Sequence, residues 1–274
     1  MTAQSDRKEA SFFDHLEELR MRILRALIYT AVGAGLAWTI RGPLLAVLRL
    51  PAEIGAHQAG IEELPFRIFE PAAGFILMMQ IALVTGLIIA SPLIFMEMWL
   101  FIKPALEPHE KRYVFWLLPT ATILFAGGVV FCYFISPRAF AFFFHINQSM
   151  GVEVELTLQP YLYFLLRLLL VFGLAFELPL VLMFLGVVGI VRASGLLAWW
   201  RHAMVAIFIV AAVATPTTDP VTMLFMAGPL ILLYVLSIGL VRLVEKRPHP
   251  SGSEDELLPP PYDELIDDPE GDVQ

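Results

Sequence analysis

The chain has 274 residues, of which 58% are hydrophobic and only 16% charged, and its mean hydropathy is +0.74. This composition excludes an ordinary soluble globular domain and is typical of a polytopic membrane protein. The net charge of −8 belongs to residues 253–274, which contain nine acids and no lysine or arginine and leave the rest of the chain at +1.

Residues 1–22 are predicted to form a cytoplasmic, amphipathic N-terminal segment. In the stretch "SFFDHLEELRMRIL" the apolar residues from Phe12 to Ile23 recur every three or four positions, which is the period of a helix that runs on into the first span. Its charged residues include Glu17, Glu18, Arg20 and Arg22. On spacing alone these charges form an ordinary solvated helix face.

Six apolar stretches within residues 23–241 qualify as membrane spans, each of which needs about 20 apolar residues. They are Ile23–Ile40, Phe75–Trp99, Val114–Ile135, Tyr161–Val188, Leu196–Ala214 and Val221–Val241. The fifth is fully apolar only from Ala203 to Ala214, so we expect it to cross only part of the bilayer. The predicted fold class is therefore all-α, a polytopic membrane protein with six transmembrane helices.

Positive charge indicates the orientation of these spans. Thirteen Lys and Arg residues fall on the side shared by the N-terminus, the second and fourth loops and the C-terminus, and at most five fall on the other side. The positive-inside rule predicts that both termini are cytoplasmic. The larger loops, near Gly42–Ala73 and Ser136–Pro160, then lie outside, and residues 242–274 form an acidic, disordered cytoplasmic tail.

The loop after the second span lies within "SPLIFMEMWLFIKPALEPHEKRYVF". Pro104 and Pro108 break its helix, so that Glu107 and Glu110 lie on a shaped cytoplasmic loop among basic neighbours. From the residues alone, two interpretations stay open. The charges only keep the segment out of lipid, or they bind a ligand.

Glu177 lies in the middle of the apolar stretch "FGLAFELPLVL" in the fourth span. An ionised carboxylate at the bilayer centre costs about 2.5–3.5 kcal/mol, so it must be neutralised, hydrated or paired. Gly173, one turn earlier, leaves space beside the carboxyl, and Pro179 is expected to kink the helix. We favour a functional polar site facing water or another helix. The alternative is a carboxyl satisfied inside the bundle by hydroxyls such as those of Thr85 or Thr122.

The turn "AVATPTTDPVTM" joins the last two spans on the outer side. Asp219 stands there between Thr218 and Pro220. By its chemistry alone it is a turn or helix-cap residue.

No constellation for catalysis or for binding a metal or cofactor is found. The stretch "HLEEL" lacks the second histidine of a zinc protease motif, and the chain has neither a Gly-rich phosphate loop nor a G-x-S-x-G motif. Cys132, the only cysteine, lies within the third span. No long basic run with interleaved aromatic residues is present, so nucleic acid is not expected as a partner.

Four stretches, taken together and in order, resemble the TatC family, the six-span core subunit of the twin-arginine protein translocase. They are "HLEELRMR" at 15–22, "SPLIFMEMWLFIKPALEPHEKR" at 91–112, "FGLAFELP" at 172–179 and "TPTTDP" at 215–220. Each stretch alone is weak, whereas the four in this order on a chain with six predicted spans are specific. The resemblance covers about Phe12 to Val241.

The resemblance implies a site that reads the paired arginines of a signal peptide. Matched position by position, Glu18 and Glu110 belong to this site, and Arg20, Phe101 and Pro104 shape the same cytoplasmic surface. An arginine side chain makes a two-pronged pair with a carboxylate that lysine cannot reproduce, so two separated acids can require two arginines.

Three further positions match family residues outside that surface. Glu177 matches the intramembrane glutamate and Asp219 the acid of the outer turn, which the resemblance links to docking of partner helices, and Pro51 matches a position used in structure or assembly. Gln80 and Val235 depart from the family, where a lysine and an acid are common.

By this resemblance the chain is a receptor of the cell membrane and not an enzyme. It binds twin-arginine signal peptides of folded precursors and nucleates their export, driven by the proton motive force, in an oligomeric complex with the single-span subunits TatA and TatB. No cofactor is expected. The alternative is an ion-coupled secondary transporter with Glu177 as proton carrier, which the absence of an internal repeat disfavours.

Overall fold

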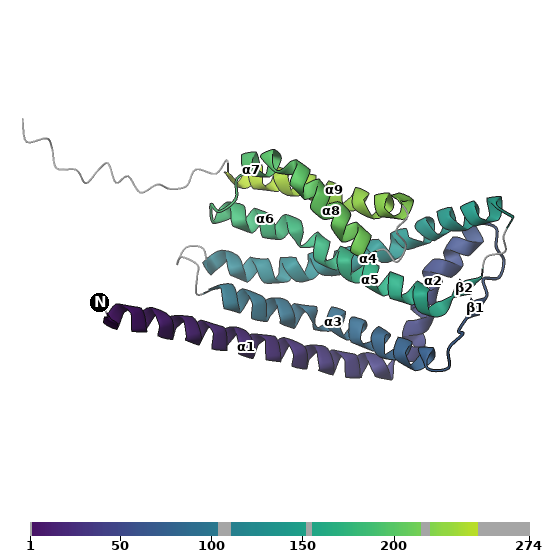
Figure 1. The fold of residues 1–274 in the computed structure, drawn as a ribbon, viewed down its shortest axis with the longest axis horizontal. Helices are drawn as coiled ribbons and strands as arrows, with labels where there is room; N and C mark the ends of the chain where they lie inside the picture. The colour runs from purple at the N-terminus through teal and green to yellow at the C-terminus, as the bar shows by residue number, and fades with distance from the viewer. Residues whose placement is uncertain (1, 104–110, 152–154, 215–219, 246–274) are drawn as a thin grey trace, which may run out of the picture.

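The computed structural model describes residues 2–103, 111–151, 155–214 and 220–245. The elements in these ranges are α1 Thr2–Thr39, α2 Arg41–Gln58, β1 Phe66–Arg67, α3 Ala73–Ile102, α4 Lys111–Ser149, β2 Leu156–Thr157, α5 Leu158–Phe176, α6 Leu178–Val187, α7 Ala193–Ala198, α8 Trp200–Ala214 and α9 Pro220–Glu245. Figure 1 shows the long helices side by side in one bundle, with α1 beginning and α9 ending at the same end of it.

Four of the described helical segments are long and apolar enough to cross a membrane. They are Ala73–Ile102, Trp116–Ser149, Leu158–Val187 and Thr222–Glu245, and they correspond to the second, third, fourth and sixth predicted spans. The pair His15–Thr39 and Arg41–Gln58, bent by 87°, makes a fifth if it is taken as one span. The 15-residue α8 reaches only about 22 Å, less than the ~30 Å of hydrocarbon, which fits the expected partial crossing.

The first helix packs mainly against α3, and the two run antiparallel. Gly33 of α1 and Gly86 of α3 meet where the helices approach most closely. A Cβ atom on Gly33 would lie 2.5 Å from the carbonyl oxygen of Gly86, and one on Gly86 would collide with the backbone of Ala34. Small residues let helices in a membrane approach in this way, so this contact sets the spacing of α1 and α3.

The stretch predicted as the outer loop 42–73 contains a helix, α2, and that part of the prediction is wrong. The chain turns at Ile40 because Pro43 has no N–H to bond the Thr39 carbonyl, while a proline is tolerated in the first turn of a new helix. Buried residues of α2 share one face, and they are Leu48, Pro51, Ala52, Gly55 and Ala56. This face packs against α4.

Pro51 interrupts the hydrogen bonding of α2, and two tyrosines from other helices bond carbonyls in the preceding turn. Because Pro51 has no N–H, the carbonyl of Val47 loses its partner within the helix. Tyr133 of α4 donates to the Val47 oxygen at 2.9 Å, and Tyr161 of α5 donates to the Leu48 oxygen at 2.7 Å. The two tyrosine hydroxyls therefore join α2 to α4 and α5, and the first of them replaces the bond that Pro51 cannot make.

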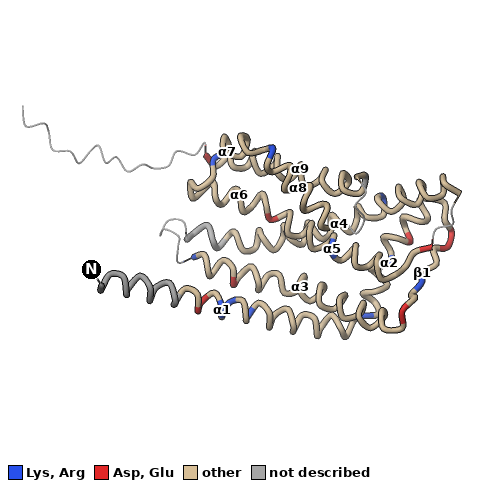
Figure 2. Tube along the Cα trace, in the orientation of Figure 1, with Lys and Arg blue, Asp and Glu red and all other residues tan. Residues whose placement is uncertain are grey.

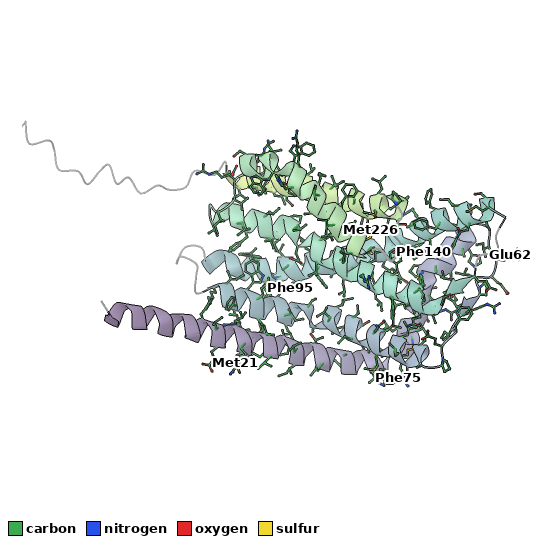
Figure 3. The ribbon with its side chains drawn as sticks, viewed as in Figure 1. Met21, Glu62, Phe75, Phe95, Phe140 and Met226 are labelled. Carbon is green, nitrogen blue, oxygen red and sulfur yellow. The ribbon has the colours of Figure 1, made fainter. Side chains whose placement is uncertain are left out.

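The predicted outer loop 136–160 is also mostly helical, because α4 continues to Ser149. Its extension is covered by α2 and α5, which bury Phe140 and Phe144. Figure 3 shows Phe140 where these helices meet, and its ring lies 5.2 Å from that of Tyr161. Short strands β1 and β2 pair in parallel, Phe66 with Leu156, and tie the segments before α3 and α5 together.

Substitution of Gly86 by alanine is expected to lower the thermal stability of the protein. The added methyl group has no room against α1, and overpacking of this kind costs about 1–3 kcal/mol. The measurement is the melting temperature of the purified variant in detergent. Gly127→Ala is the matched control, because a Cβ on Gly127 meets no atom within 4 Å. Equal melting temperatures for the two variants would contradict the close contact.

Candidate functional site

Glu97 is a buried acid in the last part of α3, with only 4% of its surface exposed. It stands within "IFMEMWLF", where its neighbours in sequence offer no cation. Its partners come from α1 instead, because the antiparallel packing brings the basic part of α1 alongside the end of α3. Figure 2 shows this group of charged residues on α1 beside an acidic position of α3.

Arg22 joins this buried acid to a second carboxylate. Its Nη1 donates to Glu97 Oε2 at 3.0 Å, while Nε donates to Glu18 Oε1 at 3.1 Å and Nη2 bonds the same oxygen. The side chain of Arg22 is 17% exposed. The hydrogen bond to Glu18 raises the pKa of Arg22 above its ordinary value, against the opposing effect of burial. The guanidinium is therefore a charged bridge between Glu18 and Glu97.

Two further groups of α1 complete the surroundings of Glu97. Nη1 of Arg25 lies 3.6 Å from Glu97 Oε2, and the Tyr29 hydroxyl donates to Glu97 Oε1 at 3.2 Å. Both oxygens of the buried carboxylate are thus partnered. Two carboxylates, Glu18 and Glu97, balance the guanidinium groups of Arg22 and Arg25.

Beyond this cluster, toward the end of α3, an aromatic contact joins the same two helices. The rings of His15 and Phe101 stack with centroids 4.4 Å apart. His15 Nδ1 also lies 3.8 Å from Glu18 Oε2. The contact brings the sequence motif that begins at His15 together with the one that contains Phe101.

The predicted solvated face of the N-terminal helix is therefore only partly right. Glu17 and Arg20 are highly exposed and lie 3.6 Å apart, as a solvated pair does. Glu18 and Arg22 lie on another face of the helix and are partly covered by α3. Of the predicted site residues, Glu18 and Phe101 are brought together by α1 and α3 through His15, and Arg20 pairs with the exposed Glu17.

Three predicted site residues lie outside the described residues: Pro104, Glu110 and Asp219. Residues 246–274, most of the predicted tail, lie outside as well, while α9 continues to Glu245. Among the residues that the structure describes, no group of three or more His, Cys, Asp or Glu side chains is placed to hold a metal ion.

Glu177 stands at a break between two helices. The helix α5 ends at Phe176 and α6 begins at Leu178, because Pro179 cannot donate to the carbonyl four residues earlier. At the break, the N–H of Glu177 donates to the carbonyl of Leu174, three residues earlier, at 3.1 Å. The break agrees with the predicted kink.

The surroundings of Glu177 differ from the expected open space. The ring of Phe125 occupies the place that Gly173 leaves, and a Cβ on Gly173 would lie 2.7 Å from this ring. Thr122 donates to the Leu118 carbonyl of its own helix. Glu177 is 9% exposed, and its Oε1 has no hydrogen-bond partner among the described residues. This oxygen is enclosed by the chain itself.

The sequence interpretation missed the roles of Glu97, Arg22 and Arg25. The signal was present, because an acid inside an apolar stretch requires a partner. Finding that partner needed the antiparallel register of α1 and α3, which brings residues 75 positions apart into contact.

Comparison with known proteins agrees with this architecture. The sequence model described as "Sec-independent protein translocase protein (TatC)" matches residues 14–229. A Sec-independent protein translocase protein TatC from Koribacter versatilis is 35% identical, over 89% of this chain and 90% of the relative. A protein of the same name from Deinococcus radiodurans is 36% identical, over 85% of this chain and 86% of the relative. A chloroplastic relative from Arabidopsis thaliana is 34% identical over 87% of this chain and 68% of its own length.

A solved structure is also similar. The crystal structure of a twin-arginine translocase receptor, TatC, matches with a TM-score of 0.77 and 33% identity, covering 84% of this chain and 99% of that one. The family model spans most of the chain, and these relatives match over 85–89% of its length. The chain belongs to the TatC family of Sec-independent protein translocase proteins.

Proposed function

We propose that this chain is the receptor and core component of a twin-arginine translocase. It binds the twin-arginine signal peptides of folded precursors at the cytoplasmic face and nucleates their export, driven by the proton motive force. The observation that carries the proposal is the stacking of His15 on Phe101. This contact joins the N-terminal motif and the motif at the end of α3 into one surface at one end of the bundle.

The chemistry of this surface suits a doubly cationic tag. Glu18 is partly exposed, with 34% of its side chain accessible, and a carboxylate of this kind makes a two-pronged pair with an incoming guanidinium. We propose Glu110 as the second acid, with Arg20, Phe101 and Pro104 around the pair. An ammonium group cannot reproduce the geometry, so lysine tags are bound less well.

We propose that the protein lies in the cytoplasmic membrane. It crosses the membrane six times and has both termini in the cytoplasm. This topology is supported by the beginning of α1 and the end of α9 at the same end of the bundle. It is also supported by the excess of Lys and Arg on that side. Residues 1–22 are the cytoplasmic N-terminal segment, 23–241 the membrane domain and 242–274 the cytoplasmic tail.

Single-span subunits of the TatA and TatB type are the proposed partners in an oligomeric complex. Glu177 and Asp219 serve their docking in this proposal, and Pro51 serves assembly. The helix break at Glu177 in the membrane domain supports the first of these roles. The ion-coupled transporter considered from the sequence gains no support from the family or from the similar structure.

Loss of either proposed arginine-reading acid is expected to weaken signal binding. Glu18→Gln and Glu110→Gln should each lower the affinity for a twin-arginine peptide by about tenfold or more, because a charge-assisted hydrogen bond is lost. The measurement is peptide binding to the purified full chain, or site-specific crosslinking from position 110. Glu17→Gln is the matched control, since Glu17 is exposed and pairs with Arg20. Unimpaired binding by both variants would refute the assignment.

Glu177→Ala is expected to leave signal binding intact and to impair contact with a partner helix. The substitution removes the buried carboxyl at the break between α5 and α6 without changing the α1 and α3 surface. The two measurements are signal-peptide binding and crosslinking to TatA or TatB in membranes, followed by an export assay. Normal export together with normal crosslinking would count against the role of Glu177.

A further inference from the structure

The carboxylate proposed to read the tag already holds an arginine of its own chain. Arg22 bonds Glu18 through Nε and Nη2 and Glu97 through Nη1. On the basis of the proposed function, we infer that Arg22 is a specificity-determining residue. It is bonded to Glu18 in the structure, and the arginine of a signal peptide that binds Glu18 displaces it.

The arginine of a signal peptide can approach Glu18 at the carboxylate oxygen that Arg22 does not bond. Both hydrogen bonds from Arg22 go to Oε1. The other oxygen, Oε2, has His15 Nδ1 at 3.8 Å, which is too far for a hydrogen bond. An incoming guanidinium can therefore bond Oε2 first and take over Oε1 as Arg22 withdraws.

Displacement leaves Arg22 with a partner. Its Nη1 is bonded to Glu97, and Glu97 is 5% exposed in its side chain, deeper than the 34% of Glu18. Glu97 also keeps Arg25 at 3.6 Å and the Tyr29 hydroxyl at 3.2 Å. The receptor therefore passes from one paired arrangement to another, and no buried charge is left alone.

The presence of Arg22 increases the preference of the site for a signal peptide with arginine over one with lysine. A group that enters must pair with Glu18 at least as well as the guanidinium that leaves. Another guanidinium meets this requirement, whereas an ammonium group, which is a more strongly hydrated point charge, does not. An empty Glu18 without Arg22 would accept lysine more readily.

The test is a binding experiment with the purified full chain in lipid nanodiscs and two synthetic signal peptides, one with paired arginines and one with paired lysines. For Arg22→Gln we expect the affinity for the lysine peptide to rise and the preference for arginine to fall by about tenfold, the scale of one charge-assisted hydrogen bond. A ratio of the two affinities is unaffected by a change in the amount of folded protein.

Arg25→Gln is the matched control, because Arg25 contacts Glu97 at 3.6 Å and is not bonded to Glu18 in the described structure. Its preference for arginine should stay within about twofold of the wild type. If Arg22→Gln does not fold, Arg22→Lys retains the charge beside Glu97 and should reduce the preference in the same direction. An unchanged preference in the folded variant would overturn the inference.

Glu18→Gln, measured alongside, separates this inference from the proposed function. If Glu18→Gln loses binding of the arginine peptide while Arg22→Gln keeps the wild-type preference, the role of Arg22 is refuted and signal recognition by Glu18 stands. If Glu18→Gln binds the arginine peptide as the wild type does, the proposed function of Glu18 fails, and the role of Arg22 fails with it.

Discussion

A carboxylate buried near the end of α3 requires a cation within reach, and α1 supplies two. Glu97 is paired with Arg22 at 3.0 Å and with Arg25 at 3.6 Å. Removing one partner of a buried ion pair costs about 3–5 kcal/mol, whereas an exposed pair such as Glu17 and Arg20 contributes about 0–1 kcal/mol. The buried pair of Arg22 and Glu97, rather than the exposed ones, therefore fixes the register of α1 on α3 and with it the position of Glu18.

Glu97 and Glu177 show two ways in which an acid is accommodated in an apolar helix. Both oxygens of Glu97 have partners from α1 within the chain. Glu177 stands instead at a helix break, with Oε1 buried and without a hydrogen-bond partner among the described residues. The first arrangement joins two helices through charged side chains, and the second lies where α5 ends and α6 begins.

The sequence predicted the elements whose signal is local. The apolar runs of α3 and α9 exceed the length of a membrane span, and Pro179 marks the break beside Glu177. The helix α2 was missed because Arg49 and Pro51 interrupt its apolar pattern and its buried face is defined by packing against α4. The bridge through Arg22 was missed for the same reason, since it depends on how two distant segments pack. The motifs containing Glu18 and Phe101 were found, but their contact came only from the structure.

The register of α1 against the end of α3 is tested most directly by crosslinking two cysteines introduced at positions 15 and 101. The variant also has Cys132 replaced by alanine, and the crosslinking is measured in membranes. The stacked rings of His15 and Phe101, with centroids 4.4 Å apart, predict that this pair is joined efficiently by a short bifunctional thiol reagent that spans the space of the two rings. A cysteine at position 17, where the native side chain is exposed, should not crosslink to position 101. Absence of the 15–101 crosslink, or equal crosslinking from position 17, would contradict the account.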